Sequence, residues 1–460
     1  MKIALTLIAA LLLAPLPELL ASDAPKPNRP NIVLIISDDQ GAGDYGFMGH
    51  PHVHTPNLDK LAAQSLWFAH GNVPTSLCCP SLASIITGLY PHQHKITAND
   101  PPAVTGATKG GRGSSPEQET RWNAALDNVP TLPRLLAAEG YLSFQTGKWW
   151  HGDFTRGGFT HGMTKGSRHG DAGLTIGREG LQPIYDFVSD ARRQKRPFLL
   201  WYAPFMPHTP HTPPERLFQK YSSKTPSPHI ARYWAMCEWF DETCGELLGY
   251  LDREGIADNT IVIYVTDNGW VQSPDRAAFA PKNKTTPFDL GHRTPIMVRW
   301  PGKVSPTRST SLASSIDIMP TVLAAVGLPK PADLHGVNLL DKKAVESRKH
   351  VFGECFTVRS QTLDDPAANM LWRWVTDGRW RLIVPRTCEA DETLKTIPRD
   401  SYLTSDLQVT LSAAKPMLYD LQVDPTEDRN LADSHPDVVA SLRSQLDALW
   451  IPKTSGKKNK

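Results

Sequence analysis

The stretch NIVLIIS at residues 31–37, followed at once by Asp38 and Asp39, decides the fold of this chain. It is a short, continuous apolar run rich in β-branched residues, which is typical of a strand buried on both faces of a parallel sheet. A second run of the same kind, NTIVIYVT at residues 259–266, also ends at a polar pair. We therefore expect a sheet whose central strands are covered by helices on both faces.

Helical and strand-like segments alternate up to about residue 345. Helical spacing is found in four segments, 57–65, 132–140, 228–255 and 315–327, and a short helix is expected at 81–87, closed by Gly88. Further buried strands are expected at 196–202 and 294–300, and long loops at 100–125 and 153–180. This alternation predicts an α/β fold with a large, mostly parallel sheet between layers of helices.

The pattern changes after residue 345, where short segments favour antiparallel strands. An Asp377-Gly378 pair predicts a tight turn between two of them, and residues 436–449 predict a terminal helix. We expect a small α+β domain here. The predicted organisation is a signal peptide at 1–24, a catalytic α/β domain at 28–345, this second domain at 346–452, and a disordered basic tail at 453–460.

The composition excludes several classes of protein. Lys and Arg number 49 against 47 Asp and Glu, and 40% of the residues are hydrophobic. This balance excludes a disordered chain, a polytopic membrane protein and the strongly basic profile of a nucleic-acid binder. The chain contains 40 prolines spread between short apolar segments, which indicates many fixed loops on a folded scaffold.

The N-terminus indicates export. Lys2 is followed by an apolar run at 3–15 and then by small residues up to Ala24, which is typical of a secretory signal peptide. A membrane anchor is the alternative, but the run has about 13 residues where a span needs about 20. We expect a periplasmic or secreted protein with no membrane span in the mature chain, and a lysosomal route stays open.

Two cysteines on one predicted helix, Cys237 and Cys244, are too far apart to form a disulfide bond and are expected to be buried thiols.

Polar pairs at the ends of the two apolar strands suggest a metal site. Asp38 and Asp39 follow one strand, and Asp267 and Asn268 follow the other. Ligands of parallel α/β sheets bind beyond the carboxyl ends of the strands, and oxygen donors suit a hard cation such as Ca²⁺ or Mg²⁺. The alternative is that each pair caps the following turn or helix, as Asp and Asn often do.

Four other residues are candidates for binding or catalysis. Cys78 precedes a short predicted helix whose N-terminal amides stabilise an anion, although a buried thiol is the commoner fate of a lone cysteine. Lys148 follows the strand-like segment YLSFQT and Lys284 lies in a predicted loop, where a lysine is usually solvated. His208 lies in PFMPHTPHTPP, where prolines fix the backbone around a polar side chain; an exposed surface histidine is the alternative.

Taken together, these motifs resemble the type I sulfatase family. The matching segments run from about residue 30 to 432: NIVLIISDDQGAGDYG, HTPNLDKLAAQS, LCCPSLASIITGLYPHQH, GKWW, PHTP, TDNG, KTTPFDLGHRTP and LYDLQVDPTEDRNLA. The resemblance implies the alkaline-phosphatase-like fold with a smaller C-terminal domain. It also implies that Cys78, in Cys-Cys-Pro-Ser-Leu, is converted to formylglycine by a formylglycine-generating enzyme, and that Cys79 is structural.

The resemblance assigns roles to the remaining candidates. The metal, usually Ca²⁺ with Mg²⁺ as the alternative, would lie on the modified Cys78 and on the two polar pairs: Asp38, Asp39, Asp267 and Asn268. Lys148 and Lys284 would hold sulfate oxygens, and His208 would protonate the leaving alcohol, with His211 a weaker candidate. A hydrated aldehyde carries two hydroxyls, so that one attacks sulfur and the other allows sulfate to be expelled.

The chain departs from the family pattern at two positions. The arginine of the Cys-x-Pro-x-Arg motif, which helps to position formylglycine and forms part of the modification signal, is replaced by Leu82. The family's Gly-Lys-Trp-His reads GKWWH here, so that the histidine, His151, is one place late. Either His151 serves as the base that releases sulfate or Trp150 occupies its place.

The leading hypothesis is therefore an exported enzyme that hydrolyses sulfate esters. A sulfated carbohydrate is the preferred substrate, because Trp and His residues in the loops suit sugar rings, and an aryl sulfate is the simplest alternative. A phosphonate or phosphate-ester hydrolase on the same scaffold is the runner-up. Leu82 and Trp150 keep a third hypothesis open, an inactive sulfatase-like protein that binds glycans.

Overall fold

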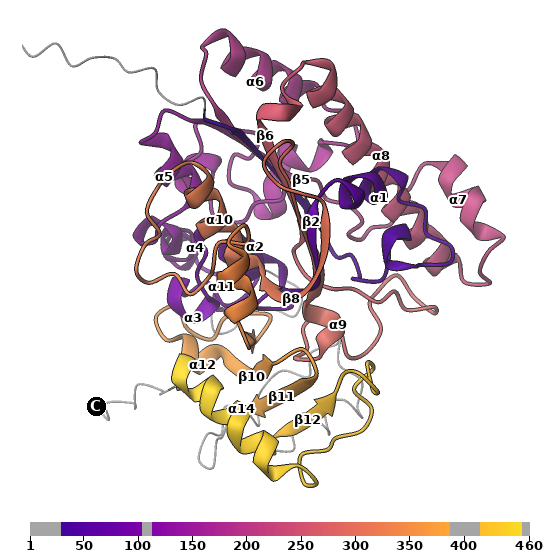
Figure 1. The fold of residues 1–460 in the computed structure, drawn as a ribbon, viewed down its shortest axis with the longest axis vertical. Coiled ribbons are helices and arrows are strands. Elements are labelled where there is room, and N and C mark those ends of the chain that lie inside the picture. Colours follow the sequence, from indigo (N-terminus) through magenta and orange to yellow (C-terminus); the bar gives the residue numbers. More distant parts are fainter. Residues whose placement is uncertain (1–28, 104–112, 387–414, 453–460) are drawn as a thin grey trace, which may run out of the picture.

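The computed structural model describes residues 29–103, 113–386 and 415–452, and they form two separate sheets (Figure 1). The larger sheet has eight strands in the spatial order β4 (His161–Gly162), β3 (Leu142–Gly147), β5 (Phe198–Ala203), β1 (Asn31–Ser37), β6 (Thr260–Thr266), β7 (Arg293–Arg299), β2 (Leu66–Asn72) and β8 (Thr307–Ser314). Neighbours from β4 to β6 are parallel, as are β2 and β8, whereas β7 runs antiparallel to both of its neighbours. The predicted α/β fold with a large, mostly parallel sheet is confirmed.

Helices cover both faces of this sheet because the side chains of its central strands alternate between two cores. In β1, Ile32, Leu34 and Ile36 point into one core, and Val33 and Ile35 into the other. The first core is covered by α2 (Cys78–Thr87), α5 (Leu132–Ala137), α10 (Ile318–Ala325) and α11 (Lys342–Ser347). The second is covered by α1 (Pro56–Ala63), α6 (Gln182–Arg193) and α8 (Pro228–Arg253).

The remaining helices are short or lie at the edges. They are α3 (Pro91–His94), α4 (Pro116–Asn123), α7 (Glu215–Ser222), α9 (Asp289–His292) and α12 (Pro366–Asn369). The helix expected at 81–87 begins earlier, so that Cys78 is its first residue, and Gly88 ends it in the left-handed region with φ 68°.

The smaller sheet is antiparallel, in the order β12 (Met417–Asp420), β11 (Trp380–Pro385), β10 (Met370–Thr376) and β9 (Val351–Phe356). The Asp377-Gly378 turn joins β10 to β11, as predicted, and Gly378 has φ 96°. Helix α14 (Pro436–Leu449) packs on one face of this sheet through Leu442 and Leu446. The boundary near residue 345 stays a prediction, and the expected signal peptide and basic tail lie outside the described residues.

Several regular elements were not expected from the sequence. Helix α4 (Pro116–Asn123) lies in the segment 100–125, so the expectation of a long loop there was wrong for this part. Strands β2 and β8 have polar or mixed sequences, LWFAHGN and TRSTSLAS, and they pair at the far edge of the sheet, where part of β8 is exposed. Helices α6, α7 and α11 were not expected either. The segment expected to be a long loop at 153–180 contains short 3₁₀ turns and the two-residue strand β4.

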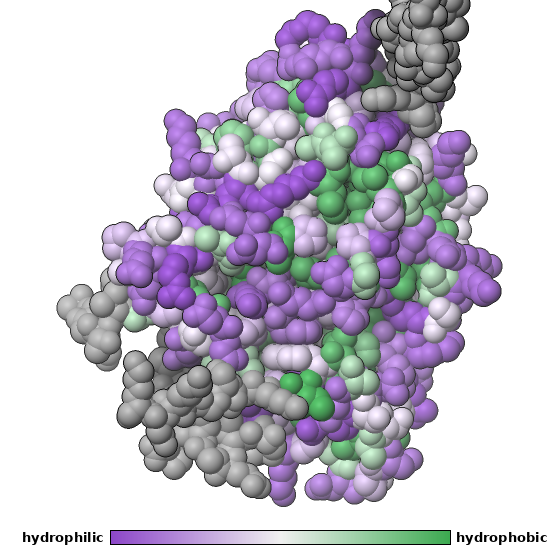
Figure 2. Space-filling view, turned by 90° about the vertical axis from the view of Figure 1, so that its left-hand side faces the viewer, coloured by the Kyte–Doolittle hydropathy of each residue, from purple (hydrophilic) through white to green (hydrophobic). Residues whose placement is uncertain are grey.

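The surface is mainly polar on the face drawn in Figure 2, where hydrophobic residues show in patches between hydrophilic ones. None of the helices within the described ranges combines the length and apolar character needed to cross a membrane.

Candidate active site

Two pairs of polar residues directly follow two neighbouring strands of the large sheet. Strands β1 and β6 are parallel neighbours whose last residues are register partners, so that Asp38-Asp39 and Asp267-Asn268 follow adjacent strand ends. The backbone N–H of Asp39 donates to Asp267 Oδ1 at 3.0 Å, and Asn268 Nδ2 donates to Asp39 Oδ1 at 2.7 Å. All four residues are buried. The parallel sheet has therefore gathered three carboxylates at one point.

This cluster fits a divalent cation. Ligand atoms of Asp38, Asp39, Cys78 and Asp267 lie within 4.8 Å of one another. Asp38 Oδ2 and Asn268 Oδ1 are buried and have no hydrogen-bond partner within the described part of the chain, which is costly for an acceptor. Hard oxygen donors of this kind suit Ca²⁺ or Mg²⁺. Asp39 also has φ 62°, a left-handed backbone that is uncommon for a residue with a side chain and is often found at functional sites.

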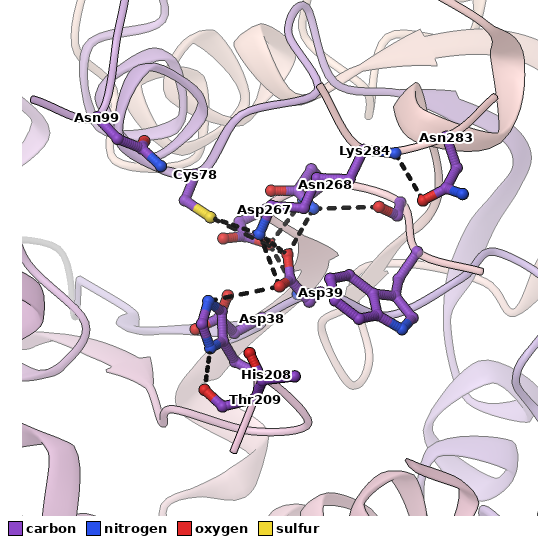
Figure 3. A network of polar contacts seen from close by, with 12 residues as sticks. Asp38, Asp39, Cys78, Asn99, His208, Thr209, Asp267, Asn268, Asn283 and Lys284 are labelled. Carbon is purple, nitrogen blue, oxygen red and sulfur yellow. Dashed lines mark hydrogen bonds and ion pairs between the residues drawn. The ribbon is translucent and has the colours of Figure 1, made fainter. Parts of the chain in front are cut away.

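Cys78 points from the start of α2 toward the carboxylates (Figure 3). Its Sγ lies 3.1 Å from Lys284 Nζ and 4.0 Å from Asp39 Oδ1. Burial raises the pKa of the Cys78 thiol to about 12, even though Lys148 and Lys284 act to lower it. An unmodified thiol here is therefore neutral near pH 7 and a poor nucleophile.

Two buried ammonium groups face the carboxylates. Lys148 follows β3, and its Nζ pairs with Asp38 and lies 3.4 Å from Asp267 Oδ2. Lys284 Nζ lies 2.6 Å from Asp39 Oδ2. Burial lowers the pKa of each lysine, but the neighbouring carboxylates outweigh it and raise both pKa values above the usual range. Both lysines are thus held charged, as the binding of an anion requires.

His208 is the most exposed member of this cluster, with 15% of its side chain accessible. Its Nε2 is 3.5 Å from Asp39 Oδ2, and its Nδ1 contacts the backbone oxygen of Thr209. Burial lowers the pKa of His208 well below its usual range, and the carboxylate of Asp39 opposes this shift. Its ring stacks on Phe205 at a centroid distance of 4.2 Å. Cys78, Lys148, His208 and Lys284, separated in the sequence, are therefore brought together.

His151 lies apart from this group. Its Nε2 is 3.4 Å from the Sγ of Cys79, and its ring lies near Trp122 and Trp149. Burial lowers the pKa of His151 to about 3. The residue beside Lys148 is instead Trp150, whose ring centroid is 5.1 Å from Lys148 Nζ. An indole has no acceptor nitrogen, so Trp150 is unable to act as a base, and the role of His151 in releasing sulfate stays a prediction.

Leu82 is buried one helical turn after Cys78. It is 4% exposed and belongs to the apolar core beneath the sheet, together with Cys79 and Ile86. The Leu82 side chain therefore packs among apolar side chains and does not bind any group of the polar site. Among the described residues, Lys284 is the cation that contacts Cys78 directly.

The loop that carries Lys284 is fixed from two sides. Near Cys78, Ser76 accepts the N–H of Thr285 through its backbone oxygen at 3.0 Å and donates its hydroxyl to the oxygen of Thr286 at 2.8 Å. From the small sheet, the buried Arg381 donates to the backbone oxygen of Pro287 at 2.8 Å. The C-terminal sheet thus helps to set the position of Lys284.

The sequence did not single out several residues around the site. Asn99 accepts the backbone N–H of Cys79 through Oδ1 at 3.0 Å. Phe205, Arg168 and His169 lie around Lys148 and His208. They come from loops with no strand-end or motif signal, apart from the proximity of Phe205 to His208 in the chain.

His211, the weaker candidate for proton transfer, lies deeper than His208. Both of its ring nitrogens are buried with no hydrogen-bond partner in the described ranges. The ring packs near Tyr233 and Trp270, and burial lowers its pKa to about 4.

The chain is similar to proteins of a known family along most of its length. A family model described as sulfatase matches residues 30–328, and a model of the C-terminal region of N-sulphoglucosamine sulphohydrolase matches residues 283–383. Human arylsulfatase A is 31% identical over 66% of this chain and 65% of its own length. An N-acetylgalactosamine-6-O-sulfatase of Bacteroides thetaiotaomicron is 26% identical over 92% of this chain and 93% of its own.

The solved structures support the fold. A sulfatase structure from a study of glycosaminoglycan metabolism in Bacteroides thetaiotaomicron has a TM-score of 0.67 and 22% identity, and it covers 92% of this chain and 99% of its own. The resemblance predicted from the motifs is therefore confirmed.

Proposed function

The chain belongs to the sulfatase family of sulfuric ester hydrolases, and we propose that it hydrolyses sulfate esters of a carbohydrate at the site around Cys78. One observation carries this proposal: Cys78 Sγ and Asp39 Oδ2 both lie within reach of the same buried ammonium, Lys284 Nζ, at 3.1 and 2.6 Å. The carbohydrate class rests on the relative named as an N-acetylgalactosamine-6-O-sulfatase, which matches nearly the whole chain.

We further propose that Cys78 is converted to formylglycine during maturation by a formylglycine-generating enzyme. When formed, this residue supplies a hydrated aldehyde, with one hydroxyl as the nucleophile and another that permits sulfate to leave. The support for this conversion is the place of Cys78 in the segment Cys-Cys-Pro-Ser-Leu and its contacts with Lys284 and Asp39.

The proposed metal is Ca²⁺, held by Asp38, Asp39, Asp267, Asn268 and the modified Cys78. A cation bound there supplies positive charge at the sulfate and at its nucleophile. The two unpartnered oxygens, Asp38 Oδ2 and Asn268 Oδ1, support this ligand set.

The remaining roles, sulfate binding and proton donation, are assigned to two lysines and a histidine. Lys148 and Lys284 would hold sulfate oxygens and stabilise the charge that develops on them. His208 would give a proton from its Nε2 to the oxygen of the leaving alcohol only in its protonated form, and the neighbouring carboxylate of Asp39 favours that form. Export by the N-terminal segment, to the periplasm or the exterior, is part of the same proposal.

Mass spectrometry and kinetics test the proposal together. We expect the Cys78 peptide of protein purified from its native host to carry formylglycine, and the protein to turn over p-nitrophenyl sulfate and N-acetylgalactosamine 6-sulfate. Activity on aryl phosphate or phosphonate that exceeds activity on the sulfates would support the runner-up chemistry instead.

Leu82 makes the mass measurement informative in a second way. If Cys78 remains a thiol and no ester is hydrolysed, the formylglycine mechanism fails for the natural sequence. The Leu82→Arg variant then separates two causes, because recovered formylglycine and turnover would identify a defective modification signal. Saccharide binding without turnover in both proteins would support a glycan-binding role.

A further inference from the structure

The loop that follows Asp39, residues 39–44, is closed by hydrogen bonds among its own residues. Asp44 donates its backbone N–H to the oxygen of Gly41 at 3.0 Å, and Asp44 Oδ2 accepts the N–H of Gly41 at 3.1 Å. The side chain of Gln40 accepts the hydroxyl of Ser37 at 2.6 Å and donates to the backbone oxygen of Asp44 at 3.1 Å. The 39–44 loop is therefore one compact turn at the end of β1.

The hydroxyl of Tyr233 contacts this loop at three places. It donates to Asp44 Oδ2 at 2.6 Å, accepts the backbone N–H of Gly41 at 3.2 Å, and lies 3.5 Å from the backbone oxygen of Asp39. A hydroxyl has a single proton to donate, so the short contact with Asp44 holds it and the contact with Asp39 is the weakest of the three. One side chain thus ties the beginning, the middle and the end of the 39–44 loop.

Tyr233 is held firmly by its surroundings. It belongs to the long helix α8, which contributes Met236, Phe240 and Leu247 to one of the two cores of the large sheet. The tyrosine itself is buried, and its ring lies beside Trp270 at a centroid distance of 6.3 Å. A side chain packed in this way has little freedom to change its rotamer, so its hydroxyl is a fixed anchor.

The 39–44 loop also lies directly against the segment that follows the second pair of proposed metal ligands. A Cβ atom on Gly41 would lie 2.4 Å from the backbone oxygen of Trp270, so that a side chain does not fit there. Trp270 comes two residues after Asn268 in the chain. The two segments that carry the proposed ligands therefore meet at Gly41, which is also bonded to Tyr233.

Asp39 needs such support for two physical reasons. Its backbone is left-handed, with φ 62°, which is costly for a residue with a side chain. Its carboxylate also lies among like charges, because ligand atoms of Asp38, Asp39 and Asp267 fall within 4.8 Å of one another. Lys148 and Lys284 offset part of this repulsion at the side chains, and the 39–44 loop restrains the backbone.

We propose that Tyr233 is a positioning residue for the metal site, whose hydroxyl acts through Asp44 and Gly41 to hold the backbone of Asp39 in the conformation that binds the cation. This inference rests on the proposed function, in which Asp39 is a metal ligand, and deepens it by naming the group that preorganises this ligand. A preorganised site binds its ion more tightly, because less free energy is spent on rearrangement.

Titration of the chelator-treated, full-length protein with Ca²⁺ tests this role without relying on turnover. Tyr233→Phe keeps the buried ring and removes only the hydroxyl. We expect its Kd for Ca²⁺, measured by calorimetry, to be about tenfold weaker than that of the wild type, as is usual when a group that orients a metal ligand is lost. Turnover of p-nitrophenyl sulfate by the variant should recover as the Ca²⁺ concentration is raised to saturation.

Tyr221→Phe is the matched control. Tyr221 is also buried, and its hydroxyl donates to Glu238 Oε2 at 2.5 Å and accepts the N–H of His54 at 3.0 Å. Each variant loses one buried bond between a tyrosine and a carboxylate, so both should show a similar fall in melting temperature. Tyr221→Phe should nevertheless keep the wild-type Kd for Ca²⁺, whereas a merely structural role of Tyr233 predicts the same Kd for both variants.

Variants of Asp44 test whether the hydroxyl acts through this carboxylate. Asp44→Asn keeps an acceptor oxygen for the hydroxyl of Tyr233 and for the N–H of Gly41, so its Kd for Ca²⁺ should stay within about threefold of the wild type. Asp44→Ala removes that acceptor and should weaken the binding of Ca²⁺ about as much as Tyr233→Phe does. An equally large loss in Asp44→Asn would assign the effect to charge and overturn the positioning role.

The outcomes for Tyr233 and for the proposed function are distinct. If Tyr233→Phe binds Ca²⁺ as the wild type does, or if Tyr221→Phe loses as much affinity, the positioning role is overturned and the sulfatase function stands. If the wild type hydrolyses sulfate esters but binds no Ca²⁺ in the same titration, the metal assignment and this inference fail together. If the wild type binds Ca²⁺ but hydrolyses no sulfate ester, the proposed function fails, and the Kd of Tyr233→Phe still decides the inference.

Discussion

Lys284 Nζ lies 3.1 Å from Cys78 Sγ, although 206 positions separate the two residues in the chain. The same ammonium lies 2.6 Å from Asp39 Oδ2. A single buried cation thus contacts both the position of the proposed nucleophile and a proposed metal ligand. Its loop is fixed by Ser76 just before Cys78, so that the lysine and the cysteine are positioned by the same local contacts.

Replacing this lysine should disable the site. We expect Lys284→Ala to lower kcat/KM for sulfate esters by about 10²–10³-fold, the usual cost of losing one preorganised charge at the reacting group. Lys282→Ala is the control, because Lys282 lies two positions earlier but pairs with Asp428 on the surface, and it should stay close to wild type. Steady-state kinetics on both variants check this. A loss of less than about fivefold in Lys284→Ala would contradict the assigned role.

The two adjacent cysteines should behave differently. We expect Cys78→Ser to release at most about one equivalent of alcohol per enzyme molecule, because a serine ester lacks the second hydroxyl that expels sulfate. Cys79→Ala removes a thiol that contacts His151 and should retain most of the activity with a modest loss of stability, about 1 kcal/mol. A burst assay distinguishes the two. Sustained turnover by Cys78→Ser would rule out the formylglycine mechanism.

Metal removal should destabilise the folded protein. Treatment with a chelator should lower the melting temperature, and Ca²⁺ at a hundred times its Kd should restore about 2.7 kcal/mol through preferential binding to the native state. Asp267→Asn should abolish most of this calcium response, since it removes one of the clustered carboxylates. Asp428→Asn, on the surface, should respond like wild type. Identical melting curves with and without Ca²⁺ would speak against the metal site.

Stability should depend on pH through Asp241. This side chain of α8 accepts the N–H of Leu58 at 2.7 Å and the amide of Asn57 at 2.8 Å, and burial raises its pKa to about 7. The folded value lies above the ordinary one of about 3.9, so the folded chain holds an extra proton between these limits. The stabilisation from this group is complete below about pH 4 and is lost as the pH rises to about 7.

The Asp241→Asn variant has no carboxyl group to titrate at this position, so its free energy of unfolding should depend less on pH. We expect the free energy of unfolding of the wild type to fall relative to the variant by roughly 1–4 kcal/mol between pH 4 and 7. Denaturant unfolding at several pH values measures the difference, with the exposed Asp258→Asn as the control. Parallel curves for wild type and Asp241→Asn would show that the carboxyl is already ionised at pH 4.

The small sheet should influence catalysis through Arg381. Its guanidinium donates to the oxygen of Pro287 from both Nε and Nη2, at 3.2 and 2.8 Å, and lies 3.8 Å from the ring centroid of Trp374. Arg381→Lys keeps the charge but loses the paired donors, so the Lys284 loop should loosen and kcat/KM should fall about tenfold. Arg379→Lys, an exposed neighbour, is the control. Equal kinetics of both variants would contradict the coupling.

Part of this molecule could be predicted from local pattern. The strands at 31–37 and 259–266 are apolar on both faces, and that pattern alone predicted their burial in a mostly parallel sheet. By contrast, β8 reads TRSTSLAS and β7 reverses direction between parallel neighbours. Strand direction and edge strands depend on pairing with distant partners, which leaves no periodic signal in the strand itself.

The candidate site also contains residues that could be predicted from the sequence and residues that could not. Cys78, Lys148, His208 and Lys284 could be selected because motifs or strand ends marked them. The position of His151 against Cys79 could not be predicted, because a shift of one residue changes which side of the chain a side chain takes. His169 was covered only by the general expectation that Trp and His residues in the loops suit sugar rings, since its exact place depends on a left-handed backbone fixed by Asp171 and by Gly147.

The sequence by itself determined the family, the apolar strands and the kinds of residue available for binding a cation and an anion. These features could be predicted because hydrophobic patterns and the order of motifs are properties of the linear sequence. Only the folded structure shows which of those residues meet: Lys284 with Cys78, Trp150 rather than His151 beside Lys148, and His169 beside His208. These choices depend on loop backbones and on distant contacts that fix side chains to within an ångström, and no local pattern encodes them.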